Sequence, residues 1–240
     1  MNSFSYYLRA IGKVPRILKQ FGRIATYVLN DENYWDEYAR VWQAEGLNGK
    51  AKYLGDEWSN KQIFLELLRK CASKDLTGLE IGCGGGRITA QAVGWLRHVH
   101  ACDVSHRMLA RCRESLAASN VSLHKIDGFT LTEFADSSLV LVYSHDVFVH
   151  FSSLQVYSYL GEIKRVLKPG GLGLISCLSF ALDFADFKET SLLYWSRRWF
   201  PPHMRLHFIT EEMLTRMLDD LGLRVREISR ENYLIVLFQK

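Results

Sequence analysis

A glycine-rich run that directly follows a short apolar stretch constrains this chain more than any other feature. The run is Glu80-Ile81-Gly82-Cys83-Gly84-Gly85-Gly86. A strand that turns sharply into a helix beside a ligand needs glycine, because a Cβ there would collide with the ligand and because glycine readily accepts positive φ. The run therefore predicts a strand, a ligand-binding loop and a helix.

The spacing of the glycines separates two kinds of cofactor. Gly82, Gly84 and Gly86 alternate, which suits a backbone lying flat against an adenosyl and methionine moiety. The wider G-x-G-x-x-G spacing instead seats a pyrophosphate on a helix N-terminus. Gly85 lies in the same run, so a dinucleotide stays open as an alternative.

Two acidic residues close the next two predicted strands. Asp103 follows the run 98–102, and Asp127 follows the run 121–126. A carboxylate at the end of the second strand can accept both hydroxyls of a ribose through its two oxygens. Three strand ends that each carry a glycine loop or an acid favour a ligand site over a tight turn that binds nothing.

Short β-rich runs alternate with helical patterns from Leu76 onward, which is typical of βαβ units and a parallel sheet. The predicted strands are 77–81, 98–102, 121–126, 138–144 and 172–178, and the predicted helices are 87–96, 105–118 and 154–167. Lys168-Pro169-Gly170-Gly171 is predicted to end the last of these helices, since proline cannot continue it and glycine permits the turn into a strand.

The C-terminal part predicts one more helix and two closing strands. Thr210 is the expected N-cap, the helix ends at Gly222, and strands follow at 223–228 and 233–238.

Together these features resemble class I methyltransferases, which use S-adenosylmethionine (SAM). The resemblance rests on the glycine run, Asp103, the Lys-Pro-Gly-Gly segment and the closing strands, and covers about residues 76–178 and 210–240. It implies a Rossmann-like, doubly wound α/β sheet of seven strands, mostly parallel with an antiparallel last strand. An N-terminal helical cap over 1–75 precedes a core over 76–240, with a lid or substrate insertion at about 179–209.

The resemblance also implies which residues bind SAM and its product S-adenosylhomocysteine (SAH). The alternating glycines shape the methionine-side loop, Glu80 orients that loop, Asp103 binds the ribose, and Asp127 lies near the adenine amine. Further cofactor contacts are expected from Val104, Met108, Gly128 and Ser144. The aromatic-rich helix predicted at 33–42 is expected to pack on the core, with direct cofactor contact as the alternative.

Methyl transfer is an in-line displacement, so the protein mainly aligns the acceptor and removes a proton where one must leave. His145 and His150 follow the predicted strand 138–144 and are the candidate bases, because imidazole can hold a proton near neutral pH. Packing or hydrogen bonding is the alternative role for either histidine. Asp146 would orient one of them.

The sequence departs from the family in two ways: the first leaves the predicted fold unchanged, and the second argues against methylation of adenine, cytosine or glutamine side chains. Val140 stands where the family often has an aspartate, and the Asp/Asn-Pro-Pro-Tyr signature of amino-group methylation on nucleic acids and glutamine is absent. The predicted function is methyl transfer to a small-molecule or lipid-like acceptor, with O- and N-methylation unresolved. A non-catalytic SAM-binding regulatory protein and a nicotinamide-dependent oxidoreductase are the alternatives.

Charge and cysteine content exclude other classes. A net charge of +4 without a dense basic stripe argues against a nucleic-acid partner. The five cysteines are scattered and form no C-x-x-C pair, so we expect neither zinc nor disulfides, and a reducing, cytoplasmic location. Spaced acids at 183, 186 and 189 are read as an exposed helix face, and no metal is predicted.

The first 30 residues contain no acid and form a basic amphipathic pattern. A surface helix packed on its own domain is the first interpretation, and peripheral contact with an anionic membrane is the second. A transit peptide is a third. No apolar stretch in the sequence approaches the roughly 20 residues that span a bilayer.

Overall fold

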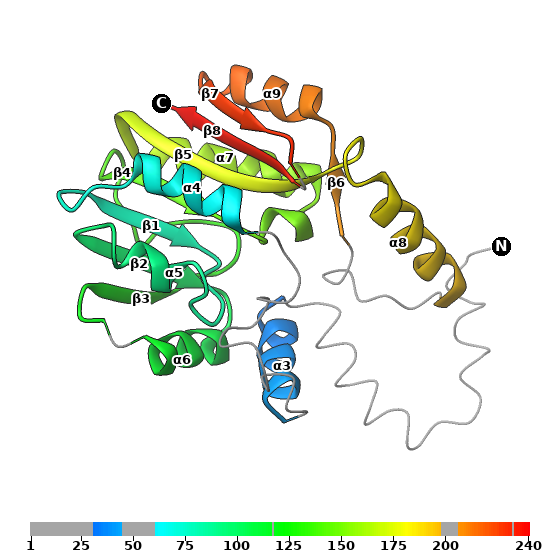
Figure 1. Cartoon of the computed structure of the whole chain (residues 1–240), viewed down its shortest axis with the longest axis horizontal. Helices are drawn as coiled ribbons and strands as arrows, with labels where there is room; N and C mark the ends of the chain where they lie inside the picture. Colours follow the sequence, from blue (N-terminus) through cyan, green and yellow to red (C-terminus); the bar gives the residue numbers. More distant parts are fainter. Residues whose placement is uncertain (1–30, 45–60, 117, 198–205, 232) are drawn as a thin grey trace.

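A computed structural model of the chain describes residues 31–44, 61–116, 118–197, 206–231 and 233–240. Its centre is a twisted sheet with the strand order β3-β2-β1-β4-β5-β8-β7 (Figure 1). The strands are β1 (Thr77–Ile81), β2 (His98–Asp103), β3 (Val121–Lys125), β4 (Leu139–Ser144), β5 (Leu167–Ser179), β7 (Arg224–Ser229) and β8 (Leu234–Gln239). Neighbours pair in parallel except β8, which runs antiparallel to both β5 and β7. The predicted doubly wound sheet with an antiparallel last strand is confirmed.

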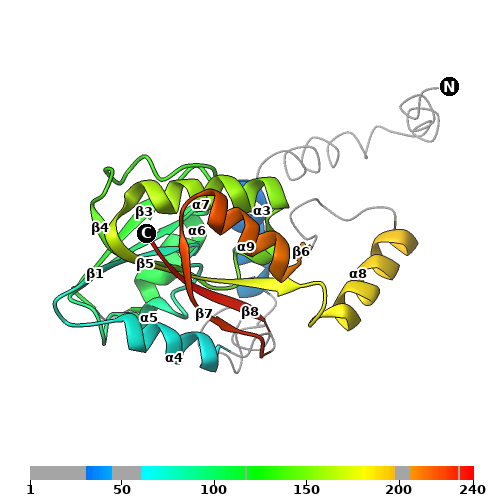
Figure 2. The ribbon, with the colours of Figure 1, turned by 90° about the horizontal axis from the view of Figure 1, so that it is seen from above.

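Helices cover both faces of the sheet (Figure 2). The helices α4 (Gln62–Cys71), α5 (Thr89–Ala92) and α6 (His106–Ser115) share one apolar cluster with the sheet, and α7 (Ser153–Val166) and α9 (Glu211–Asp220) share the other. Central strands buried on both faces read as nearly continuous apolar runs, which β4 illustrates with Leu-Val-Leu-Val. Helix α4 lies inside the range predicted as a cap, yet it packs on the sheet through Phe64 and Leu68. The boundary at 75/76 stays a prediction.

Local capping explains where several helices begin. The Thr210 hydroxyl accepts a hydrogen bond from the Met213 amide at 3.1 Å, which confirms the predicted N-cap of α9. Ser152 and Gln155 form a capping box at the start of α7. The predicted helix 87–96 is shorter than expected: α5 spans only four residues, because tight turns such as the bond from the Gly94 amide to the Gln91 carbonyl replace helical bonding.

The Lys-Pro-Gly-Gly segment differs from its prediction as a turn before the fifth strand. β5 already begins at Leu167, directly after α7, and the segment lies within it. The pairing with β4 shifts from Leu139 opposite Leu167 to Leu141 opposite Leu172, so the intervening residues bulge out of register. The Gly170 amide then donates to the Lys240 carbonyl at 2.8 Å, which ties the C-terminal residue to this bulge.

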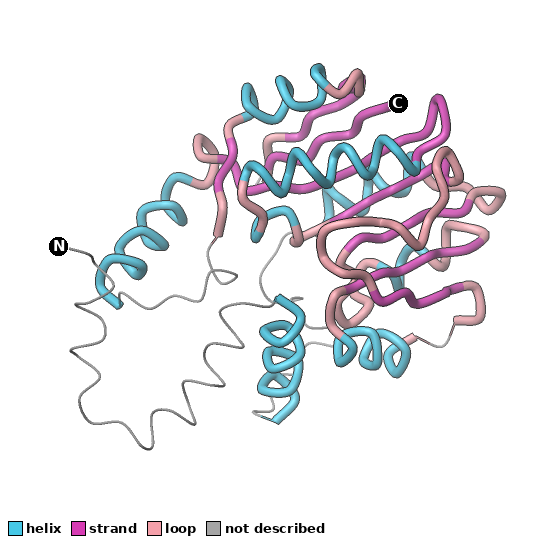
Figure 3. The backbone as a smooth tube through the Cα atoms, turned by 180° about the vertical axis from the view of Figure 1, so that it is seen from behind, coloured by secondary structure: helices cyan, strands magenta, loops and turns pink. Residues whose placement is uncertain are grey.

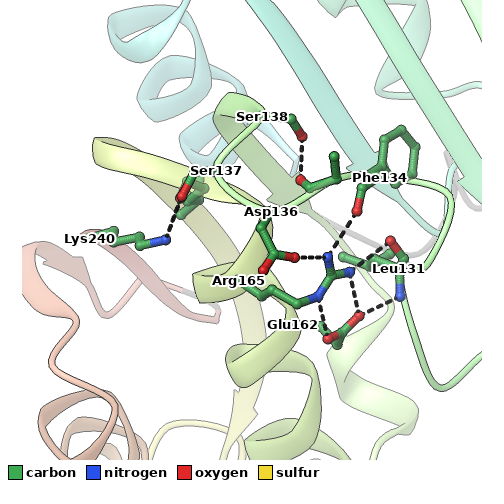
Figure 4. A network of polar contacts seen from close by, with 10 residues as sticks. Leu131, Phe134, Asp136, Ser137, Ser138, Glu162, Arg165 and Lys240 are labelled. Carbon is green, nitrogen blue, oxygen red and sulfur yellow. Dashed lines mark hydrogen bonds and ion pairs between the residues drawn. The ribbon is translucent and has the colours of Figure 1, made fainter.

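The connection from β3 to β4 is held against α7 by Arg165 (Figure 4). Its guanidinium donates to the carbonyls of Leu131 and Phe134, both at 2.9 Å, and pairs with the carboxylates of Glu162 and Asp136. The Leu131 amide in turn donates to Glu162 at 2.7 Å. This network fixes the loop that follows the end of β3.

Two helices lie beyond the layered core. Helix α3 (Asp31–Ala44) packs near α6, and α8 (Phe184–Arg197) extends away from the sheet (Figures 1 and 3). A short strand, β6 (Phe208–Ile209), follows and pairs with the end of β5. Among the described residues, no helix is both long enough and apolar enough to cross a bilayer. The basic segment 1–30 lies outside the described residues.

Candidate active site

A cavity of about 500 Å³ opens at the carboxyl ends of β1 to β4. This is the edge of an open α/β sheet at which ligands bind. Most of the residues predicted to bind a cofactor or to act in catalysis line it: Glu80, Gly82, Gly84, Asp103, Val104, Met108, Gly128, His145 and His150. The fold therefore brings together side chains from four separate strand ends.

The three alternating glycines have different surroundings in the loop after β1. Gly82 has a φ of +70°, and a Cβ added there would lie 2.3 Å from Cγ2 of Val147, so this glycine permits contact between the loop and the segment after β4. Gly84 has a φ of +50°, and an added Cβ would meet no atom of the described residues within 4 Å, apart from those of its chain neighbours. An added Cβ at Gly86 would lie 3.0 Å from the Cys112 sulfur, on the α6 side. Of these three glycines, Gly84 alone has open space beside it among the described residues.

Asp103 ends β2 and holds the loop through its carboxylate. Oδ2 accepts a hydrogen bond from the Gly84 amide at 2.9 Å, and Oδ1 accepts one from the Ser105 amide at 2.8 Å. Burial raises the pKa of this carboxyl to about 6, although the two backbone hydrogen bonds oppose the shift. Each oxygen keeps a further lone pair, so the carboxylate can also accept hydroxyl groups from a ligand.

Glu80 lies beneath the glycine loop and is 3% exposed. Burial raises its pKa to about 8, so the carboxyl is mainly neutral at pH 7. The Tyr143 hydroxyl donates to its Oε2 at 3.3 Å. Its place between β4 and the loop is compatible with the predicted role of orienting that loop.

The two candidate bases have different surroundings. The His145 side chain is fully buried, its ring stacks on Phe64 with centroids 4.4 Å apart, and its Nδ1 lies 2.9 Å from the Ser176 hydroxyl. Burial lowers the pKa of His145 to about 4, so its imidazole is neutral at pH 7.

His150 instead belongs to the short helix η1 (Phe148–His150) and is only half-buried. Its ring meets that of Trp35 edge to face with centroids 4.9 Å apart. Both histidines line the cavity, but His150 is half-buried there, while the His145 side chain is fully buried.

Three predicted cofactor residues do not line the cavity. Gly86 faces α6, and the Ser144 hydroxyl donates to the Ile81 carbonyl at 2.9 Å, which joins the ends of β4 and β1. Asp127 is exposed, and its carboxylate accepts hydrogen bonds within its own turn from the Phe129 and Thr130 amides, both at 2.7 Å. Contact of these residues with a cofactor stays a prediction.

Helix α3 forms an aromatic wall of the cavity through Tyr34, Trp35 and Tyr38. It is held by charge: Asp36 accepts a hydrogen bond from the Arg107 amide at 3.0 Å, at the start of α6, and Glu32 lies 3.2 Å from Lys125. A carboxylate at a helix N-terminus is favoured by the helix dipole. Helix α3 thus both packs on the core and contributes side chains to the wall of the cavity.

Arg87 and Tyr233 were not assigned to a ligand site from the sequence, and both line the same cavity. Arg87, directly after the glycine run, forms an ion pair with Asp146, two residues beyond the end of β4. Tyr233, before β8, hydrogen-bonds to Asp146 and also lines the cavity. The position of a cation beside the glycine run was a usable signal, whereas nothing in the sequence around Tyr233 indicates this contact.

Comparison with known proteins finds similarity to methyltransferases. Residues 79–175 match the family described as a methyltransferase domain. Phosphoethanolamine N-methyltransferase 1 of Triticum aestivum is 28% identical over 160 residues, which cover 63% of this chain and 30% of that protein. A malonyl-[acyl-carrier protein] O-methyltransferase of Pectobacterium atrosepticum is 32% identical over 128 residues, covering 53% and 45%. A ubiquinone biosynthesis O-methyltransferase of Sinorhizobium fredii is 25% identical over 159 residues, covering 64% and 62%.

The chain thus spans less than two thirds of the length of each of these three relatives.

Solved structures share its fold. A putative methyltransferase of Haloferax volcanii, in complex with the Trm112 activator, aligns with a TM-score of 0.64 and 18% identity over 85% of this chain and 96% of that one. An S-adenosylmethionine dependent methyltransferase of Mesorhizobium loti aligns with a TM-score of 0.62 and 16% identity over 77% and 99%.

Proposed function

We propose, from the premise that this chain carries a class I, SAM-dependent methyltransferase domain, that it transfers a methyl group from SAM to a small-molecule or lipid-like acceptor. The observation that carries the proposal is a single cavity in which the open face of Gly84, the Asp103 carboxylate and His150 meet. A dinucleotide site would need a helix N-terminus aimed at a pyrophosphate. The helix after this loop has only four residues.

The residues present fit the cofactor. Gly84 leaves open space where a side chain would otherwise stand, and the Asp103 carboxylate has lone pairs for the ribose hydroxyls. Gly128 and Met108 line the cavity beyond Asp103, on the side expected to receive the adenine. Bound SAM supplies a methyl group activated by a sulfonium, so no covalent intermediate on the protein is required.

The protein's own part in the reaction is to exclude water, orient the acceptor and receive its proton. We assign proton removal to His150, because it is half-buried at the cavity wall. His145 is assigned a supporting role, since its buried ring holds a proton poorly at neutral pH. Positioning by the Trp35 ring keeps His150 directed along the wall.

The acceptor side of the cavity is mostly apolar, with Val149, Phe151, Leu178 and Leu206 in its lining. Such a surface favours an acceptor with an apolar body over a strongly charged one. The similarity to a ubiquinone biosynthesis O-methyltransferase supports a lipid-like acceptor, and the similarity to a phosphoethanolamine N-methyltransferase keeps nitrogen acceptors in the screen. Contact of residues 1–30 with a membrane belongs to the same proposal.

Calorimetric titration of SAM, SAH and NADH tests the cofactor without knowledge of the acceptor. We expect micromolar binding of SAM and SAH to the wild type, loss of binding in Asp103→Ala, and retention in the control Asp75→Ala, which removes an exposed acid that does not line this cavity. Folding of each variant is checked by thermal unfolding. Binding of NADH alone by folded wild type would replace this proposal with the oxidoreductase alternative.

Catalysis and membrane contact need two further measurements. A panel of phenols, amines and carboxylic acids, with and without alkyl chains, is screened for release of SAH. Binding of SAM without turnover on any of them would favour a non-catalytic SAM-binding protein.

Co-sedimentation with anionic liposomes, comparing the full chain with a variant lacking residues 1–30, tests the membrane contact, and equal binding of both proteins would refute it.

A further inference from the structure

The ion pair between Arg87 and Asp146 joins two segments that the proposed reaction must hold together. Arg87 follows the glycine loop, and Asp146 stands between β4 and His150. The side chain of Arg87 is 8% exposed and that of Asp146 is 20% exposed. A pair so shielded from water keeps most of its Coulomb attraction, and its two charges cancel at the cavity wall.

The backbone of Asp146 is held in an unusual conformation. Its φ is +60°, which is uncommon for a residue other than glycine, and its amide donates to the Ser176 hydroxyl at 3.1 Å. The same hydroxyl lies 2.9 Å from Nδ1 of His145. Positive φ at such a residue persists only when surrounding contacts enforce it, and it is concentrated at functional sites.

A second contact joins the same two segments. Gly82 of the glycine loop lies so close to Val147 that an added Cβ would be 2.3 Å from its Cγ2. The helix η1, which carries His150, begins at the next residue, and the His150 amide donates to the Val147 carbonyl at 3.0 Å. A shift of the glycine loop is therefore passed directly to the start of η1.

We propose that Arg87 and Asp146 are a positioning pair that couples occupancy of the glycine loop to the order of residues 145–151, and thereby sets the place of His150 relative to the bound cofactor. The inference rests on the proposed function. The Asp146 carboxylate is engaged by Arg87 and Tyr233, so it orients the segment instead of serving as a proton acceptor.

Hydrogen exchange with and without SAH tests the coupling. The variants are Arg87→Met, Asp146→Asn and the double variant, and Arg87→Lys is the conservative variant that keeps the charge. Glu162→Gln is the matched control, because it removes an acid of the arginine network in Figure 4, outside the cavity. SAH affinity by calorimetry and thermal unfolding are measured on each protein.

In the wild type and the control, SAH should slow exchange in both residues 82–88 and residues 145–151. In each single variant we expect slowing to persist in 82–88, while exchange in 145–151 with SAH bound becomes faster than in wild type by about fivefold or more. The double variant should be no worse than either single variant, because both remove the same interaction. Arg87→Lys should restore part of the protection.

The experiment distinguishes failure of the positioning pair from failure of the proposed function. Undiminished protection of 145–151 in both single variants, or additive effects in the double variant, would overturn the positioning pair while leaving the proposed function intact. If a single variant does not fold, the double variant decides, since removing both charges avoids an unpaired buried ion. Absence of SAH binding by folded wild type would overturn the proposed function, and this inference with it.

Discussion

Adding one methyl group at Gly84 separates the structural and ligand-binding roles of the glycine loop. Gly84 and Gly222 both have positive φ, +50° and +67°. At both positions an added Cβ meets no atom of the part of the chain that the structure describes within 4 Å, chain neighbours aside. Gly84 lines the cavity, whereas Gly222 follows α9 and does not line it. Gly84→Ala and Gly222→Ala are therefore a matched pair that differs in the presence of a ligand site.

The magnitudes follow from these two geometries. Alanine in the left-handed region costs roughly 1–2 kcal/mol, so each variant should lower the free energy of unfolding by about that amount. For a chain of this length that corresponds to a fall in Tm of about 2–4 °C for each kcal/mol. Only in Gly84→Ala does the new methyl group occupy ligand space, and we expect SAH affinity to fall by about tenfold or more, or about 1.4 kcal/mol.

The assay is urea unfolding of both variants together with calorimetric titration of SAH. Equal losses of stability with a selective loss of affinity in Gly84→Ala would support direct contact between the loop and the cofactor. Equal SAH affinity in the two variants would refute the argument that the open face of Gly84 receives the ligand. A much larger loss of stability in Gly84→Ala would show that the space at Gly84 is closed by protein.

Three further predictions concern charge and catalysis. The raised pKa of Glu80, about 8, gives a stabilising contribution that is fully present below the unfolded pKa of about 4.5 and is lost as pH rises through 8. The free energy of unfolding, measured in urea from pH 5 to 9, should therefore fall more steeply with pH for wild type than for Glu80→Gln, and parallel curves would contradict this. His150→Ala should lower turnover by about 10²-fold or more with SAH affinity nearly unchanged, and more than His145→Ala does once stability is matched. Arg165→Met should lower the free energy of unfolding by about 2 kcal/mol in urea, since two loop carbonyls lose a charged donor, and should leave SAH affinity unaltered.

Sequence alone determined the fold class and located the glycine loop. Alternation of short β-rich runs with helical patterns is a local property of the chain, and it was enough to predict the parallel sheet. The antiparallel closing strand was predicted from the resemblance to class I methyltransferases. The glycine run and Asp103 were recognisable for the same reason, because the backbone of a loop and the acid at a strand end are specified by residues adjacent in sequence. The structure places them at one cavity, and their contact with a cofactor stays a prediction.

Tertiary structure decided the surroundings of the individual side chains. His145 and His150 were equivalent in the sequence, and only their burial separates them, because it depends on Phe64, Ser176 and Trp35 from distant elements.

The partners of the charged residues were likewise decided by the tertiary structure. Arg87 and Asp146 pair across the sheet edge, while Asp127, which ends a strand as Asp103 does, bonds to its own turn instead of lining the cavity. Periodicity along a chain specifies which residues form a strand or helix. The pKa and the partners of a side chain depend on atoms brought near it only when those elements pack.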